Sequence, residues 1–221
     1  MIRFVVGGGL LITRLCRKVS SFFIVHGIIA NNDREVYEYS FEILLSTALS
    51  FLVIFIIAIA SDTFVYTALY FVAFIPLRLI AGGYHAKNHF RCFLILMFTY
   101  VAFLLLLSFL PVAFLALSTT FAMTISIILV FLIAPSEDTN KPISNDERVG
   151  FRKKSRVTII CYVAAICILL FFVFDARFAF SIALGNLTVA LSLIVNKVKN
   201  EISRKRYSTN IRKEVVQNET S

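Results

Sequence analysis

Long apolar blocks separated by short polar stretches make up most of this chain. Each block carries almost no charged side chains and approaches the roughly 20 residues that an α-helix needs to cross the hydrocarbon core of a bilayer. Apolar and polar residues do not alternate within the blocks, as they would in the strands of a membrane β-barrel. The pattern therefore predicts an all-α, polytopic membrane protein with about six transmembrane helices.

The predicted spans are Ile43–Ala60, Thr63–Ile80, Phe93–Leu110, Val112–Ala134, Val157–Phe174 and Phe178–Val195. The links at Ser61-Asp62, Pro111 and Asp175–Arg177 are short enough to be tight turns. Ahead of the spans, the chain from Leu10 to Ala30 is basic in its first half and apolar in its second. This arrangement predicts an N-terminal amphipathic helix at the membrane interface.

Positive charges fall almost entirely on one side of the predicted arrangement. Of the 22 Lys and Arg residues, all except Arg177 lie in four stretches. These are the chain before the first span, the second loop (residues 81–92) together with Arg78, the fourth loop (residues 135–156) and the chain after the sixth span. Short cytoplasmic loops accumulate Lys and Arg, so both termini and the loop at residues 81–92 are predicted to be cytoplasmic.

This topology divides the chain into three parts. Residues 1–42 form a cytoplasmic and interfacial amphipathic segment, residues 43–195 a six-span membrane domain, and residues 196–221 a basic cytoplasmic tail. Because the tail is polar and charged, it is expected to be partly disordered.

Composition and charge support a membrane protein over a nucleic-acid-binding one. Hydrophobic residues make up 59% of the chain, well above the roughly 45–50% of soluble domains. The net charge is +9, but the basic residues flank apolar blocks and no nucleic-acid-binding motif is present, so no nucleic acid is expected as a partner. Anionic lipid headgroups are the expected partner of these charges, although those of the basic loop Arg148–Arg156 could equally attract an acidic peptide segment.

The segment from Arg78 to Cys92 gathers most of the groups that could do chemistry. It holds two of the three histidines, one of the four cysteines, the pair Gly82-Gly83 and three positive charges. Cys92 would lie in the first turn of the third span, where the helix dipole and Arg91 favour the nucleophilic thiolate. No CxxC pair or Cys/His cluster has zinc-ligand spacing, so no metal or other cofactor is expected.

Two histidines could serve Cys92 as a base. On a continuous helix His85 would lie about 10.5 Å from Cys92 along the axis, too far for a hydrogen bond, unless the chain turns after Gly82-Gly83. His89 precedes Cys92 by three residues and needs no such turn. The residues alone leave both histidines open.

Two rival functions also suit six spans. A small transporter would need buried Asp, Glu or His side chains to relay ions or protons, and the predicted spans lack them. A non-catalytic scaffold that binds a peptide would make Cys92 dispensable.

The same segment resembles the signature of the accessory gene regulator B (AgrB) family, in which an Arg precedes Ala-Gly-Gly-Tyr-His-Ala and then Arg-Cys. The matching residues here are Arg78, Ala81–Ala86, Arg91-Cys92 and, outside the signature, Glu35–Tyr39, Ala134-Pro135 and Asn140–Pro142. The similarity covers most of the chain, although Ser40 stands where Gly is more often expected.

The resemblance implies a cysteine endopeptidase in a bacterial cell membrane that processes quorum-sensing propeptides. It makes Cys92 the nucleophile and His85, rather than His89, the base. Arg78, Gly82 and Gly83 become candidates for substrate binding or an oxyanion hole. The implied partners are an AgrD-like propeptide, cut at its C-terminal tail and closed to a thiolactone or lactone, and a second copy of the chain in a homodimer.

Overall fold

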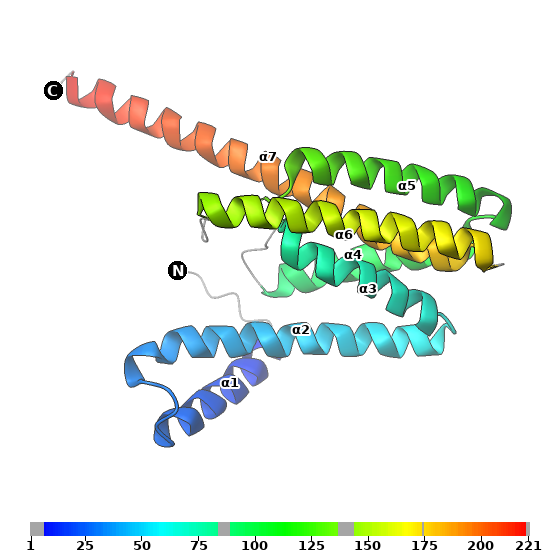
Figure 1. The fold of residues 1–221 in the computed structure, drawn as a ribbon. Helices are drawn as coiled ribbons and strands as arrows, with labels where there is room; N and C mark the ends of the chain where they lie inside the picture. The colour runs from blue at the N-terminus through cyan, green and yellow to red at the C-terminus, as the bar shows by residue number, and fades with distance from the viewer. Residues whose placement is uncertain (1–6, 84–88, 137–143, 174, 220–221) are drawn as a thin grey trace. The chain divides into compact units, whose positions relative to one another are not determined.

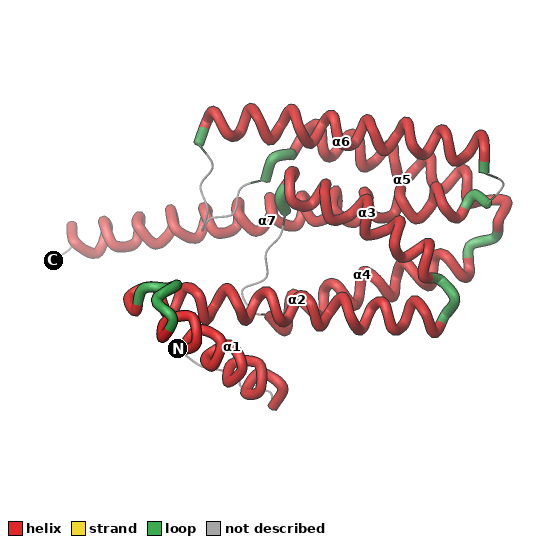
Figure 2. Tube along the Cα trace, turned by 60° about the horizontal axis from the view of Figure 1, so that its bottom comes forward, coloured by secondary structure: helices red, strands yellow, loops and turns green. Residues whose placement is uncertain are grey.

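The structure is a computed structural model that describes residues 7–83, 89–136, 144–173 and 175–219. Its elements are α1 (Gly7–Val25), the 3₁₀ turn η1 (Asn31–Asp33), α2 (Arg34–Ala60), α3 (Phe64–Ala81), α4 (His89–Phe109), α5 (Val112–Ile133), α6 (Asn145–Phe172) and α7 (Arg177–Glu219). Links that lie wholly within the described chain join α1 to α2, α2 to α3 and α4 to α5 (Figure 2). Helices α2 to α7 are each long and apolar enough to cross a membrane, which confirms the predicted all-α chain with six spans.

Three helices extend well beyond the predicted spans. Helix α2 begins at Arg34, α6 begins at Asn145 and α7 continues to Glu219. Hydropathy detects the apolar part of a helix, whereas Lys, Arg and Glu extend a helix readily into water. The expectation of a partly disordered tail is therefore wrong for the described residues up to Glu219.

The stretch Arg148–Arg156 is also helical, and not the loop that we expected. A capping box starts α6, because the Ser144 hydroxyl accepts the Glu147 N–H at 3.3 Å and the Glu147 carboxylate accepts the Ser144 N–H at 3.2 Å. This reciprocal pair satisfies two donors at the helix start and fixes the start before the basic residues.

Two compact units divide the chain. The first contains α1, α2 and α4 up to Tyr100, and the second contains α3, α4 from Val101, α5, α6 and α7. The predicted boundaries at residues 42 and 195 separate the membrane domain from the segments outside the membrane. The two compact units do not test that division, which stays a prediction.

In the first unit, α1 folds back along α2 (Figure 1). Helix α1 ends at Val25, earlier than the predicted Ala30, where Gly27 takes a left-handed φ of 69°. The rings of Phe23 and Phe41 stack at 5.7 Å, and Arg34 of α2 donates to the Ser21 hydroxyl of α1 at 3.3 Å. The N-terminal helix thus packs against α2.

In the second unit, α7 is the most enclosed helix and contacts α3, α5 and α6 (Figure 1). In its most apolar window 61% of residues are buried, against 33% or less in the other five candidate spans. Gly185 permits this, because a Cβ there would lie 2.4 Å from the Tyr70 carbonyl oxygen of α3. Small residues at a crossing let two membrane helices approach closely, and the Tyr70 hydroxyl adds a hydrogen bond to Thr188 at 3.0 Å.

Candidate active site

The predicted site residues that the structure describes fall in different units. Cys92 lies in the first turn of α4 in the first unit, and its side chain is exposed. Arg78, Gly82 and Gly83 lie in the second unit. His85 and the side chain of His89 are outside the described residues, so the choice of base stays a prediction.

The chain leaves α3 through a short segment of fixed backbone, Ala81–Gly83, which we call the glycine segment. Gly82 has a φ of 77° and Gly83 a φ of 132°. The Gly82 N–H donates to the Arg78 carbonyl oxygen at 3.1 Å, and the Ser136 N–H donates to the Ala81 carbonyl oxygen at 2.9 Å. Gly82 and Ser136 also form an isolated parallel bridge, which ties α3 to the chain after α5.

Both positions require glycine. A Cβ at Gly82 would lie 2.4 Å from the Ser136 carbonyl oxygen, and a Cβ at Gly83 would lie 1.8 Å from Arg78 Nη1. Positive φ values add a conformational penalty for any residue with a Cβ. The glycine pair is therefore more than a tight loop, since it lets backbone and guanidinium come into contact.

Arg78, in the last turn of α3, contacts this segment through its side chain. Its Nη1 donates to the Gly82 carbonyl oxygen at 3.1 Å and to the Ser192 hydroxyl of α7 at 2.8 Å. A cation is also favourable beside the C-terminal end of a helix dipole. The charge of Arg78, which falls inside the second predicted span, is thus held by hydrogen bonds.

Helix α7 contributes two residues that sequence reasoning missed. Ser192 accepts from Arg78, and the fully buried Asn196 donates from Nδ2 to the Ser136 hydroxyl at 2.8 Å. Their spacing of four places them on one face of the helix. That spacing was the available signal, but Ser192 was read as part of an apolar span and Asn196 as the start of the tail.

The proposed oxyanion role of the two glycine amides meets one constraint. The Gly82 N–H is already used on the Arg78 carbonyl oxygen. It would have to leave that bond before it could donate to a substrate.

The two ends of the second unit carry different charges. At the end that holds the glycine segment, exposed basic residues occupy the first turns of α6 and the part of α7 that follows Asn196. They are Arg148, Arg152, Lys153, Lys154, Lys197, Arg204 and Lys205. At the opposite end of α3, the Tyr66 hydroxyl donates to the Asp175 carboxylate, which also accepts the Arg177 N–H at 3.0 Å. Exposed basic side chains are therefore concentrated at the end of the second unit that holds the glycine segment.

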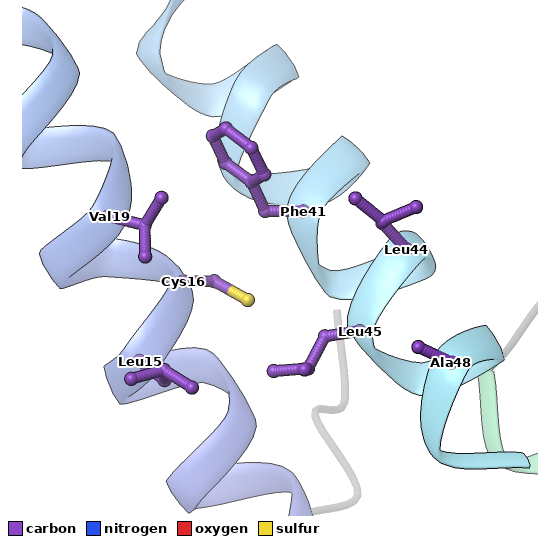
Figure 3. Close-up of a pocket in the computed structure, with 7 residues that line it drawn as sticks. All are labelled: Leu15, Cys16, Val19, Phe41, Leu44, Leu45 and Ala48. Carbon is purple, nitrogen blue, oxygen red and sulfur yellow. The ribbon is translucent and has the colours of Figure 1, made fainter. Parts of the chain in front are cut away.

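A second thiol faces an apolar pocket of about 260 Å³ between α1 and α2 (Figure 3). Cys16 points into it, and the other lining residues are Leu15, Val19, Phe41, Leu44, Leu45 and Ala48. Burial first, and then Glu42 and Glu38, raise the pKa of the Cys16 thiol. A neutral thiol among apolar side chains is a poor nucleophile, so this pocket does not compete with Cys92.

No group of three or more His, Cys, Asp and Glu residues in the described chain could hold a metal ion. The first unit by itself offers an exposed thiol at the start of α4. The second unit by itself offers a glycine segment held by the Arg78 guanidinium.

Comparison with known proteins gives two matches. The family model described as accessory gene regulator B matches residues 15–194. The chain is also 26% identical over 148 residues to the accessory gene regulator protein B of Staphylococcus carnosus (strain TM300), an alignment that covers 65% of this chain and 73% of that protein. No solved structure matches the chain.

Proposed function

Since the chain belongs to the accessory gene regulator B family, we propose that it is a membrane cysteine endopeptidase that removes the C-terminal tail of an AgrD-like propeptide. The observation that carries this proposal is the signature Arg78, Ala81–Ala86 and Arg91-Cys92, which lies inside the matched region. An exposed thiol in the first turn of α4 and a glycine pair that tolerates no Cβ are consistent with it.

The first chemical step makes an acyl-enzyme. His85 accepts the proton of the Cys92 thiol, and the thiolate attacks the scissile carbonyl carbon to form a tetrahedral oxyanion. As the peptide C–N bond breaks, the histidine returns the proton to the leaving amine, and the tail departs. The acyl group remains on Cys92 as a thioester.

The second step closes the ring. A thiol within the propeptide gives up its proton to His85 and attacks the thioester, so that a new thioester forms and the Cys92 thiolate leaves beside the protonated histidine. Exchange between thioesters is nearly balanced in free energy, whereas hydrolysis is strongly downhill. The cyclising thiol must therefore outcompete water through a high effective concentration at the acyl carbon. A site at the membrane interface helps by limiting water.

The transporter and scaffold alternatives have less support. The buried hydroxyl groups of Thr119, Ser126 and Ser181 in the second unit donate to carbonyl oxygens of their own helices. Such internal bonds make no path for ions. A scaffold gives no reason for a thiol at the start of α4.

The test is tail release from an AgrD-like propeptide by the protein in lipid nanodiscs. Cys92→Ala and His85→Ala should each abolish release while membrane abundance stays near normal. Cys161→Ala and Cys167→Ala are matched controls, because both thiols are exposed on α6, and they should release tail at the wild-type rate. His89→Ala should keep substantial activity.

Intact-protein mass spectrometry then tests the intermediate. A propeptide whose ring-forming residue is replaced by Ala should leave an acyl adduct on Cys92 that hydroxylamine removes. Tail release by Cys92→Ala, with no adduct under any quench, would overturn the proposed mechanism.

We also propose that both termini and the glycine segment face the cytoplasm. The basic residues of the second unit support this, because they gather at the end where Ser136 joins the glycine segment to α7. In a cysteine-free background, Lys87→Cys should resist an impermeant maleimide added to intact cells and react after lysis. Strong labelling in intact cells would contradict the proposed topology, because it would place position 87 outside the cell.

A further inference from the structure

The glycine segment is tied to α7 by two separate connections. In the first, the Ser192 hydroxyl donates to the Val189 carbonyl oxygen of its own helix at 2.7 Å. Its lone pairs therefore face Arg78, whose Nη1 donates to it at 2.8 Å while also donating to the Gly82 carbonyl oxygen. One guanidinium nitrogen thus links α7 directly to the backbone of the glycine segment.

The second connection lies one helical turn farther along α7. Asn196 is fully buried and donates to the Ser136 hydroxyl at 2.8 Å. Ser136 in turn donates its backbone N–H to the Ala81 carbonyl oxygen at 2.9 Å. This relay holds the chain after α5 against the glycine segment.

The glycine segment needs such ties because its own residues supply little rigidity. Glycine has access to more backbone conformations than any other residue, and two in succession can redirect the chain widely. His85 follows Gly83 by two residues. The direction in which the chain leaves Gly83 therefore limits where the imidazole can be placed.

We propose that Ser192 and Asn196 are positioning residues of the peptidase reaction, which act through Arg78 and Ser136 to fix the backbone that leads to His85. The inference rests on the proposed function, because that function makes His85 the base. Neither residue needs to touch the substrate. Their effect should fall on kcat, since a displacement of about 1 Å in a catalytic group can cost about 100-fold in rate.

The first test compares two serines of α7. Ser192→Ala removes the acceptor for Arg78 and should lower kcat for tail release about tenfold, with KM changed less than about twofold. Ser192→Thr keeps a hydroxyl that can bond back to its own helix and should restore kcat to within about threefold of wild type. Ser181→Ala is the matched control, because that buried hydroxyl donates to the Arg177 carbonyl oxygen at 2.8 Å at the far end of the helix.

The second test uses the Asn196–Ser136 pair. Asn196→Ala and Ser136→Ala should each lower kcat, and the double variant should be no slower than the slower single variant, since both changes break one connection. Ser136 lies after α5 and outside the helices, so its variant tests the connection even if Asn196→Ala lowers membrane abundance.

Hydrogen exchange measured on the protein in nanodiscs gives a readout independent of activity. In Ser192→Ala, the amides of Gly82 and Ser136 should exchange faster than in wild type, and in Ser181→Ala they should not. Wild-type kcat in Ser192→Ala together with unchanged exchange at these amides would overturn the positioning role. Failure of the proposed function would show differently, as tail release by Cys92→Ala, and would leave the exchange result unaffected.

Discussion

The two ends of α3 are both joined to the α7 region by polar side chains, but one connection holds backbone in place and the other holds side chains. At one end, Arg78 donates to both Ser192 and the Gly82 carbonyl oxygen, and so holds a glycine segment that tolerates no Cβ. At the other end, Tyr66 bonds Asp175, beside the start of α7, and its ring packs against Phe178 at 5.2 Å. The first connection fixes backbone, whereas the second fixes side chains at a helix start.

This difference separates stability from chemistry. A hydrogen bond between helices stabilises the bundle wherever it occurs, by about 0.5–1.5 kcal/mol, or more with a charged partner. Only at the Arg78 end does the same bond also set the path of the chain toward a predicted catalytic residue. Equivalent substitutions at the two ends should therefore have similar effects on stability and very different effects on activity.

The largest effect is expected from Gly83→Ala. The new Cβ would lie 1.8 Å from Arg78 Nη1 and 2.4 Å from the Ser192 hydroxyl oxygen, at a φ of 132°. Arg78 would have to leave the Gly82 carbonyl oxygen, so tail release should fall by about 1,000-fold or more. The measurement is kcat for tail release by protein purified from the membrane.

Gly150→Ala is the matched control for that change. Gly150 is exposed on α6, and a Cβ there meets nothing within 4 Å. The substitution should raise stability by about 0.5–1 kcal/mol through lower chain entropy and leave kcat unchanged. Equal activity in Gly83→Ala and Gly150→Ala would contradict the idea that the Arg78 end of α3, unlike the Tyr66 end, controls activity.

A smaller loss is expected from Arg78→Met, which keeps much of the side-chain length but removes charge and donors. The Gly82 carbonyl oxygen and the Ser192 hydroxyl would both lose the bond from Nη1. We expect kcat to fall about 100-fold, with Arg78→Lys between Met and wild type, because Lys restores the charge without the planar guanidinium. Steady-state kinetics of the three proteins at equal membrane abundance provides the check.

The sequence predicted the helical spans because membrane insertion depends on apolar length, which is local in the chain. It also singled out Arg78, Gly82 and Gly83 as candidate site residues, and the structure shows Arg78 in contact with both glycines. Their role in the reaction stays a prediction. It did not identify Ser192 or Asn196, because their partners lie 114 and 60 residues away. A polar residue in an apolar helix gives no local sign of which distant group it meets.

The extended starts of α2 and α6 were missed for another reason. Span prediction follows hydropathy and stops at the first charged residues, although these residues continue the helix. For α6 a local signal was present in Ser144 and Glu147, whose spacing is that of a capping box. The error therefore came from weighing hydropathy over capping, and the sequence contained the information needed to avoid it.

The smallest effect on activity is expected from Tyr66→Phe, and it tests the comparison most directly. The change removes the hydrogen bond to the Asp175 carboxylate but keeps the ring that packs against Phe178. A bond to a charged acceptor contributes about 1.5–3 kcal/mol when enclosed, and this site is only partly buried, so we expect about 1 kcal/mol of lost stability. Thermal unfolding in micelles should shift downward, while kcat for tail release stays within about twofold of wild type. If Tyr66→Phe instead slowed tail release as much as Ser192→Ala, α3 would transmit any loosening to the site, and the special role of the glycine end would be lost.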